Sequence, residues 1–184
     1  MLSEHGSEVP ISKISEHAGV TEATIYNHFK NRETLLMEAF VDAFSKWEEW
    51  VFETIVHVTD PLERIIFPAR ILTRLRSTHP MYAKLISKNL EYSRNLYSAI
   101  SDQLIIDFEN LEKSGIHTCD DLKNRVKLMT ACFAEAVNEQ LLNPNSPSSV
   151  ADDLFEIALE LVKIPPVKAK KLAHSQLPLD VSIN

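Results

Sequence analysis

Glycine is scarce in this sequence, since only Gly6, Gly19 and Gly115 occur among 184 residues. Sheet proteins need many tight turns, and glycine suits such turns because it adopts a positive φ without steric cost. The scarcity therefore favours an all-helical fold over a β-sandwich or a β-barrel. A hydrophobic share of 45% and a charged share of 24% are typical of a folded globular chain rather than a disordered one.

Cysteine and long apolar runs are scarce as well. Cys119 and Cys132 form neither a disulfide framework nor a metal-ligand spacing, which predicts two reduced thiols in a cytoplasmic protein. Glu4 and Glu8 lie where a signal peptide would be apolar, and no run of about 18 apolar residues could span a membrane. Convergent catalytic side chains and a phosphate loop are also missing, so we expect no enzyme, no catalytic residue, no cofactor and no metal site.

Positive charge is in deficit, with 19 lysines and arginines against 26 acidic residues and a net charge of −7. This balance argues against a protein that binds polyanions through bulk electrostatics. A DNA reader with this charge has to concentrate its basic side chains locally.

Helical periodicity is abundant from residue 10 onwards. Apolar side chains recur three and four residues apart, and prolines and capping residues separate the runs. The predicted helices span 12–18, 22–29, 31–58, 61–79, 81–89, 91–113, 120–142 and 148–164. Gly19 and Gly115 are predicted left-handed helix ends. Residues 165–184 show no period, so we expect a mobile tail there.

The segment 11–36, ISKISEHAGVTEATIYNHFKNRETLL, has the pattern of a helix-turn-helix. Gly19 lies between two short helices, Val20 and Ile25 supply apolar contacts, and Phe29 closes the second helix. The wider pattern resembles the signature of TetR family regulators. The matching residues are Ala18-Gly19-Val20-Thr21, Thr24-Ile25-Tyr26, His28-Phe29, Arg32-Glu33 and Leu35-Leu36.

The resemblance implies an all-α protein in two parts. A helix-turn-helix DNA-binding domain (1–36) shares the long helix with a helical ligand-binding and dimerisation domain (37–164). The helix 22–29 would enter the major groove of double-stranded operator DNA. The DNA-contacting residues it implies are Thr21, Glu22, Ala23, Thr24, Tyr26, Asn27 and His28, with Lys30 and Arg32 on phosphates. For Tyr26, packing against the preceding helix is the alternative, and Thr24 or His28 could be merely solvated.

The N-terminal segment departs from the family in two ways. Before Gly6 there is barely one helical turn, so we expect a first helix that is truncated in this chain. Residues 1–36 also hold three basic side chains, Lys13, Lys30 and Arg32, against five glutamates. Affinity for DNA should therefore be modest.

The predicted helix 148–164 is apolar over a wider arc than one neighbour can cover. A second subunit is one explanation, giving a homodimer through helices 120–142 and 148–164. The alternative is that both faces are buried within one chain. The predicted interface residues are Leu128, Ala131, Ala134, Phe155, Leu159 and Val162.

In the family, the helices behind the DNA-binding domain enclose a small-molecule pocket. The resemblance leads us to expect a largely apolar effector, lined by Trp47, Phe67, Tyr82, Met129 and Phe133, with Arg70 as a polar contact. Ordinary core packing is the alternative for each of them. Pro68, inside a helix, frees the carbonyl of Arg64 and bends the element, which either opens a cavity or only shapes the packing.

These expectations describe a ligand-responsive transcriptional regulator, most simply a repressor that binds a palindromic operator as a homodimer and is released by a small molecule. The alternative is a dimeric small-molecule-binding or adaptor protein that has lost specific DNA binding. Binding of operator DNA separates the two.

Overall fold

The computed structural model describes residues 8–88 and 90–179, and within these ranges the chain is helical with no strand. Its helices are α2 (Ile11–Ala18), α3 (Glu22–His28), α4 (Arg32–Thr54), α5 (Pro61–Leu72), α6 (Leu75–Thr78), α7 (Pro80–Ser87), α8 (Leu90–Lys113), α9 (Leu122–Leu142), α10 (Ser148–Leu161) and α11 (Pro166–His174). The predicted all-α class is confirmed. Among the residues described, none of these helices is long and apolar enough to cross a membrane.

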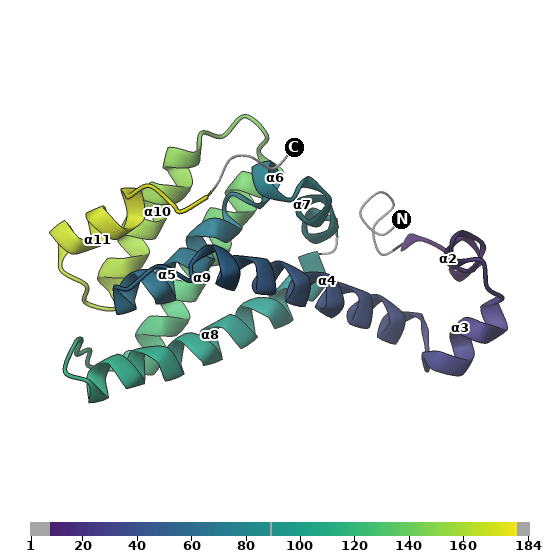
Figure 1. Ribbon diagram of the computed structural model, residues 1–184, viewed down its shortest axis with the longest axis horizontal. Helices are drawn as coiled ribbons and strands as arrows, with labels where there is room; N and C mark the ends of the chain where they lie inside the picture. The colour runs from purple at the N-terminus through teal and green to yellow at the C-terminus, as the bar shows by residue number, and fades with distance from the viewer. Residues whose placement is uncertain (1–7, 89, 180–184) are drawn as a thin grey trace.

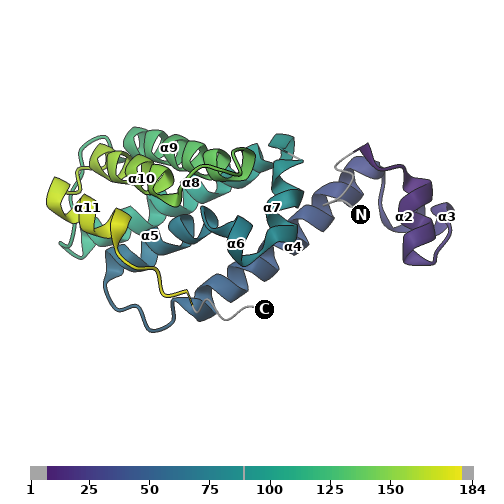
Figure 2. The ribbon, with the colours of Figure 1, turned by 90° about the horizontal axis from the view of Figure 1, so that it is seen from above.

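Helix α4 joins two unequal parts of the molecule. In Figures 1 and 2, α2 and α3 extend from its N-terminal end, while α5 to α11 pack around the rest of it. The helix starts sharply, because the Asn31 side chain accepts a hydrogen bond from the Thr34 N–H at 2.8 Å. The same rigid element therefore borders both parts.

The turn between α2 and α3 forms as predicted. Gly19 has φ +69°, a left-handed conformation that a side chain would strain. Its N–H donates to the Glu16 carbonyl at 3.2 Å, and the Val20 N–H donates to the Ser15 carbonyl at 3.0 Å. Thr21 then caps α3 by accepting from the Thr24 N–H at 3.1 Å. Gly115, after α8, has the same left-handed φ of +69°, which confirms the second predicted helix end.

The large part has two adjoining cores. One lies among α5, α8, α9, α10 and α11, around Phe108, Met129 and Phe155, which are fully buried. The other lies among α4, α5, α6, α7 and α9, around Val51 and Ile71. Helices α5 and α9 contribute to both cores, so they are the shared elements of this part.

The prediction of a mobile tail from residue 165 is wrong for the stretch that forms α11. Proline is welcome in a first helical turn, so Pro165-Pro166 ends one helix and also begins the next. Ala169, Leu172 and Ala173 of α11 are buried against α10. Three lysines and one histidine make the rest of its sequence look unstructured. Residues 180–184 of the predicted tail lie outside the described residues.

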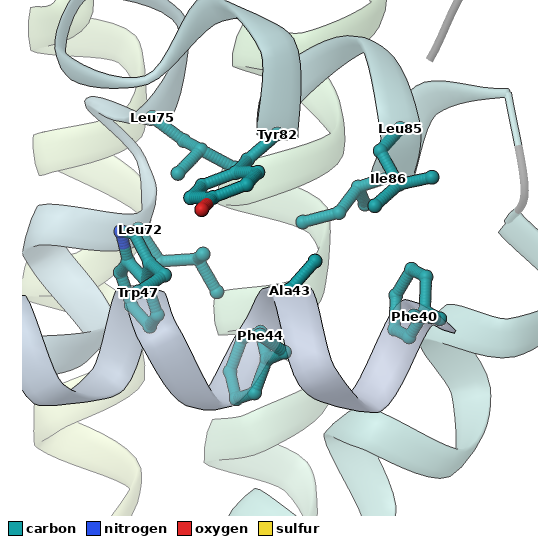
Figure 3. Close-up of a pocket in the computed structure, with 9 residues that line it drawn as sticks. All are labelled: Phe40, Ala43, Phe44, Trp47, Leu72, Leu75, Tyr82, Leu85 and Ile86. Atoms are coloured by element: carbon teal, nitrogen blue, oxygen red, sulfur yellow. The ribbon is translucent and has the colours of Figure 1, made fainter. Parts of the chain in front are cut away.

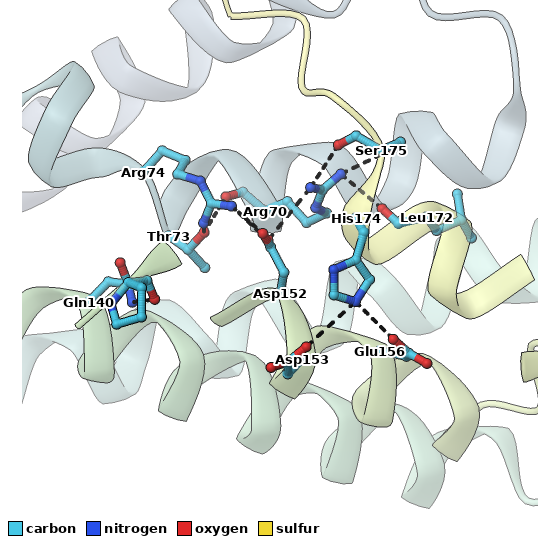
Figure 4. A network of polar contacts seen from close by, with 11 residues as sticks. Arg70, Thr73, Arg74, Gln140, Asp152, Asp153, Glu156, Leu172, His174 and Ser175 are labelled. Carbon is cyan, nitrogen blue, oxygen red and sulfur yellow. Dashed lines mark hydrogen bonds and ion pairs between the residues drawn. The ribbon is translucent and has the colours of Figure 1, made fainter. Parts of the chain in front are cut away.

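Arg70 of α5 holds α11 in place (Figure 4). Its side chain is only 2% exposed, and its guanidinium donates to the Leu172 carbonyl and to the Ser175 carbonyl, each at 2.9 Å. The Asp152 carboxylate lies 3.6 Å from it and also binds Arg74 at 2.7 Å. Burial lowers the pKa of Arg70, and Asp152 opposes this effect. Charge-assisted bonds of this kind are stronger than neutral ones, so α11 is firmly docked.

Candidate DNA-binding surface and effector cavity

Helix α3 presents most of its side chains to solvent. Within α3, only Ile25 is buried. Tyr26 is 51% exposed, which disfavours the alternative that it is packed away against the preceding helix. The other predicted DNA contacts that are exposed are Thr21, Glu22, Ala23, Asn27, His28 and Lys30. The arrangement suits a helix that presents its polar face to a groove.

Thr24 is half-buried and its hydroxyl lies 2.9 Å from that of Thr21. This pair provides a hydrogen-bond acceptor for the first turn of α3, because the Thr21 hydroxyl also accepts from the Thr24 N–H. A DNA contact by Thr24 or Thr21 stays a prediction, and each residue has a structural role beside it.

Arg32 connects the start of α4 to the chain before α2. Its Nε and Nη2 donate to the Val9 carbonyl at 3.2 and 3.0 Å. The predicted phosphate contact of Arg32 would therefore depend on Nη1. Sequence reasoning missed this bond, because Val9 and Arg32 are 23 positions apart. Within the described residues of this end, the buried apolar side chains are Val9, Ile11, Ile25 and Leu36.

A cavity of about 660 Å³ lies between α4, α5 and α8, within the size range of small-molecule sites. The α4 wall carries Met37, Phe40, Val41, Phe44, Ser45, Trp47, Glu48, Val51, Phe52 and Ile55. The α5 wall carries Arg64, Ile65, Pro68, Ala69 and Leu72, and the α8 wall carries Leu96, Ala99, Ile100, Gln103, Leu104 and Asp107. Val41 and Phe52 are 53% and 60% exposed, so the cavity opens to solvent on this side.

The polar groups on the cavity wall are few. Gln103 donates to Asp107 Oδ1 at 2.9 Å. Burial raises the pKa of Asp107, against the hydrogen bond from Gln103, and burial also raises the pKa of Glu48. Arg64 donates from Nη1 to the Val58 carbonyl at 3.1 Å. A ligand here would meet mostly carbon, with carboxylates as the main polar feature.

A second, much smaller cavity of about 10 Å³ lies on another side of α4 (Figure 3). Tyr82, Leu85 and Ile86 of α7 face it across from Ala43. Phe40, Phe44, Trp47 and Leu72 line both cavities. This space has room for about one water molecule, so it is a packing defect rather than a ligand site.

Of the six residues predicted to line a pocket, Trp47 lines the large cavity and Tyr82 lines the small one. The structure corrects the other four, which line neither cavity. Met129 and Phe133 belong to the core beneath α10, where the Phe133 and Phe155 rings stack with centroids 4.1 Å apart. Phe67 packs against Arg70, whose guanidinium carbon is 5.8 Å from the ring centroid, and Arg70 holds α11. Pro68 does line the large cavity.

The predicted dimer residues divide into two groups. Phe155, Leu159 and Val162 are completely buried within one chain, so for them the structure corrects the prediction in favour of its alternative. The reason is α11, which covers the second face of α10. Leu128 is 57% exposed, Ala131 is exposed and Ala134 is half-buried. Ile157 of α10 is 58% exposed, so an open apolar face, defined by Leu128, Ala131 and Ile157, remains on α9 and α10.

Residues 1–39 match the family described as bacterial regulatory proteins, tetR family. The fatty acid metabolism regulator protein of Bacillus subtilis (strain 168) is 24% identical over 172 residues, with 88% of each chain covered. A structure of RolR in complex with its ligand resorcinol has a TM-score of 0.75 at 22% identity, covering 97% of this chain and 89% of RolR. A structure of RolR without ligand has a TM-score of 0.71 at 21% identity, covering 97% of this chain and 93% of RolR. The family match covers the α2–α3 end, and the structural likeness extends over the whole fold.

Proposed function

We propose that this chain is a regulator of the TetR family, that it binds a palindromic operator as a homodimer, and that it releases the operator when a small apolar molecule enters the cavity between α4, α5 and α8. Repression is the simplest consequence, because a bound dimer obstructs transcription from its own site. The protein would act in the cytoplasm, where its DNA is.

The observation that carries the proposal is the double role of α4. Its first turn is tied to the helix-turn-helix through the bond from Arg32 to Val9. From Met37 to Phe52 the same helix walls the cavity, and its C-cap residue Ile55 adds to this wall. A molecule that pushes this wall would therefore tilt the element on which α3 is mounted. The effect requires the molecule to bind the two orientations with different affinities.

The dimer face we propose is the open apolar face of Leu128, Ala131 and Ile157. Two copies joined there would form a four-helix interface of α9 and α10. A two-fold axis through it would present two α3 helices to successive major grooves, about 34–36 Å apart. The fold resembles that of RolR, whose structure contains resorcinol, and this supports a small ligand for the cavity.

The test is fluorescence anisotropy of the full chain with labelled DNA from upstream of its own gene, against a random duplex of equal length. We expect tighter binding to the upstream DNA, and loss of it on addition of one member of a panel of aromatic and aliphatic molecules that includes resorcinol. Equal and weak binding to both duplexes would contradict the proposal.

The acidic balance of residues 1–36 favours one second candidate, a dimeric small-molecule-binding protein without specific DNA binding. The same measurement separates the two. Ligand binding with no preference for any upstream fragment would favour the second candidate.

A further inference from the structure

We infer that the cavity between α4, α5 and α8 selects an apolar amine, a molecule with a hydrocarbon body and a protonated head, over a carboxylate of the same shape. The inference rests on the proposed function only in taking this cavity as the effector site. It concerns the chemistry of the ligand head group, which no resemblance specifies.

The first step is the charge on the wall. Glu48 enters from α4 and Asp107 from α8, while Arg64 of α5 is the one cationic side chain among the described lining residues. Arg64 is exposed and its Nη1 is engaged with the Val58 carbonyl. No ion pair is formed by Glu48 or Asp107 within the described part of the chain. The described lining therefore carries two carboxylates against one guanidinium, which is an excess of negative charge.

The second step is the surroundings of the two carboxylates. Aromatic and aliphatic side chains such as Phe44, Phe52 and Leu104 make up most of the walls. Burial raises the pKa of both carboxyl groups. Asp107 is half-buried and Glu48 is exposed at the mouth of the cavity, so the ionised form of Asp107 is the more poorly solvated of the two. An ammonium group would restore the lost solvation by donating hydrogen bonds and supplying the opposite charge.

The third step compares the possible head groups. Asp107 Oδ1 already accepts from Gln103, which leaves Oδ2 and all of Glu48 to accept from a ligand. A protonated amine has three donors, and a hydroxyl has one and no charge. A carboxylate head has no donor and would lie beside like charges. We therefore expect the order amine, then alcohol, then carboxylate.

The experiment titrates octylamine, 1-octanol and octanoate into the full-length protein, without DNA, by calorimetry and by tryptophan fluorescence. Trp47 lines the cavity and Trp50 is the only other tryptophan, so the fluorescence reports on this region. We expect octylamine to bind at least tenfold more tightly than octanoate at pH 7. Octanoate binding as tightly as octylamine, or binding of none of the three, would overturn the inference.

Variants with matched controls identify the responsible carboxylates. Asp107→Asn and Glu48→Gln should each lower octylamine affinity several-fold and narrow its advantage over octanoate. Asp102→Asn and Glu49→Gln make the same changes at exposed positions outside the lining of the same two helices, and should leave all three affinities unchanged. Equal losses in cavity and control variants would show bulk electrostatics and overturn the inference.

Because no DNA is present, a failed head-group order leaves operator binding untouched, and failed operator binding leaves the order standing. The inference and the proposed function can therefore be rejected separately.

Discussion

The two ends of α4 are built on different principles. At the N-terminal end, the candidate DNA contacts lie within Thr21–Arg32 and are mostly exposed, and four apolar residues are buried among those that the structure describes there. At the other end, the cavity is assembled from three helices between Met37 and Asp107, beside two large cores. The first site is a surface displayed by one short segment. The second is the space that three helices leave unfilled.

This difference predicts how the two ends respond to substitution. A change on the displayed surface should alter binding while the fold stays intact, since little is buried there. A change in the large part should alter the free energy of unfolding first, because its side chains are close-packed. The comparison would fail if substitutions on the displayed surface mainly changed stability, or if substitutions in the large part changed binding alone.

The largest effect should come from α10, where buried and exposed apolar residues alternate. Phe155 is completely buried and stacked on Phe133. Phe155→Ala should lower the free energy of unfolding by about 3–5 kcal/mol in a urea titration, as large buried aromatic residues do.

Ile157, two residues further along and 58% exposed, is the matched position. Ile157→Glu should leave each chain folded but convert the proposed dimer to a monomer by light scattering, because a charge would be buried in the interface without a partner. A dimer that persists in this variant would remove the open apolar face as the interface.

Arg70 should have the next largest effect. Arg70→Ala leaves the Leu172 and Ser175 carbonyls without their donor, while Asp152 keeps Arg74. We expect a loss of about 3 kcal/mol in unfolding free energy and earlier proteolysis after α11. Arg76→Ala removes an exposed arginine nearby and should change stability by less than about 0.5 kcal/mol. Weakened ligand binding with unchanged stability would instead restore Arg70 as a pocket residue.

The same division decides what the sequence could predict. The helix-turn-helix was readable because its constraints are local: Gly19 must adopt positive φ, and Thr21 must cap the next helix. B-DNA has fixed dimensions, so residues that read it keep a recognisable spacing. The long shared helix followed from its period.

The large part was predicted only in outline. Helix lengths were clear, but whether α10 meets a second subunit or α11 depends on a nine-residue helix whose lysines hide its apolar side. An arginine at position 70 looks the same in the sequence whether its side chain binds a ligand or a backbone carbonyl 102 residues away. The cavity depends on how α4, α5 and α8 diverge from one another, and the spacing of apolar residues within any one helix does not show this. Only Trp47 and Pro68, among the residues singled out, line it.

Tyr26 tests the displayed surface directly. It is 51% exposed on α3. Tyr26→Ala should therefore leave unfolding unchanged while lowering the ratio of operator to random-duplex affinity by roughly 1–3 kcal/mol, the usual loss for a good base contact. Anisotropy titrations on both duplexes give this ratio. An unchanged ratio with weaker binding to both would make Tyr26 a backbone contact.

Arg32 and Lys30 separate folding from phosphate contact within the same end. Arg32→Ala removes two bonds to Val9, so we expect about 1–2 kcal/mol less protection of α2 amides in hydrogen exchange, with the large part unaffected. Lys30 is exposed, and Lys30→Ala should leave exchange unchanged. It should reduce the salt slope of binding to both duplexes by about two for a symmetric dimer. Faster exchange in both variants would mean that the two residues share a structural role.

Asp107 gives the smallest effect, and its sign matters more than its size. Burial raises the pKa of this carboxyl in the folded chain, so protonation favours the fold. That contribution is present below the ordinary aspartate pKa and is lost as the pH rises through the raised one.

Asp107→Asn keeps an acceptor for Gln103 and removes the charge. At pH 7 it should therefore be equally stable or slightly more stable than the parent, within about 0.5 kcal/mol. The difference should vanish near pH 3, where the parent carboxyl is protonated too. Asp102→Asn, at an exposed position of α8, should show no such pH dependence in thermal unfolding. A variant that is clearly less stable at pH 7 would mean that Asp107 already has a cationic partner in the free protein. The carboxylate would then be a packing element of the large part rather than a charge that the cavity keeps available for a ligand.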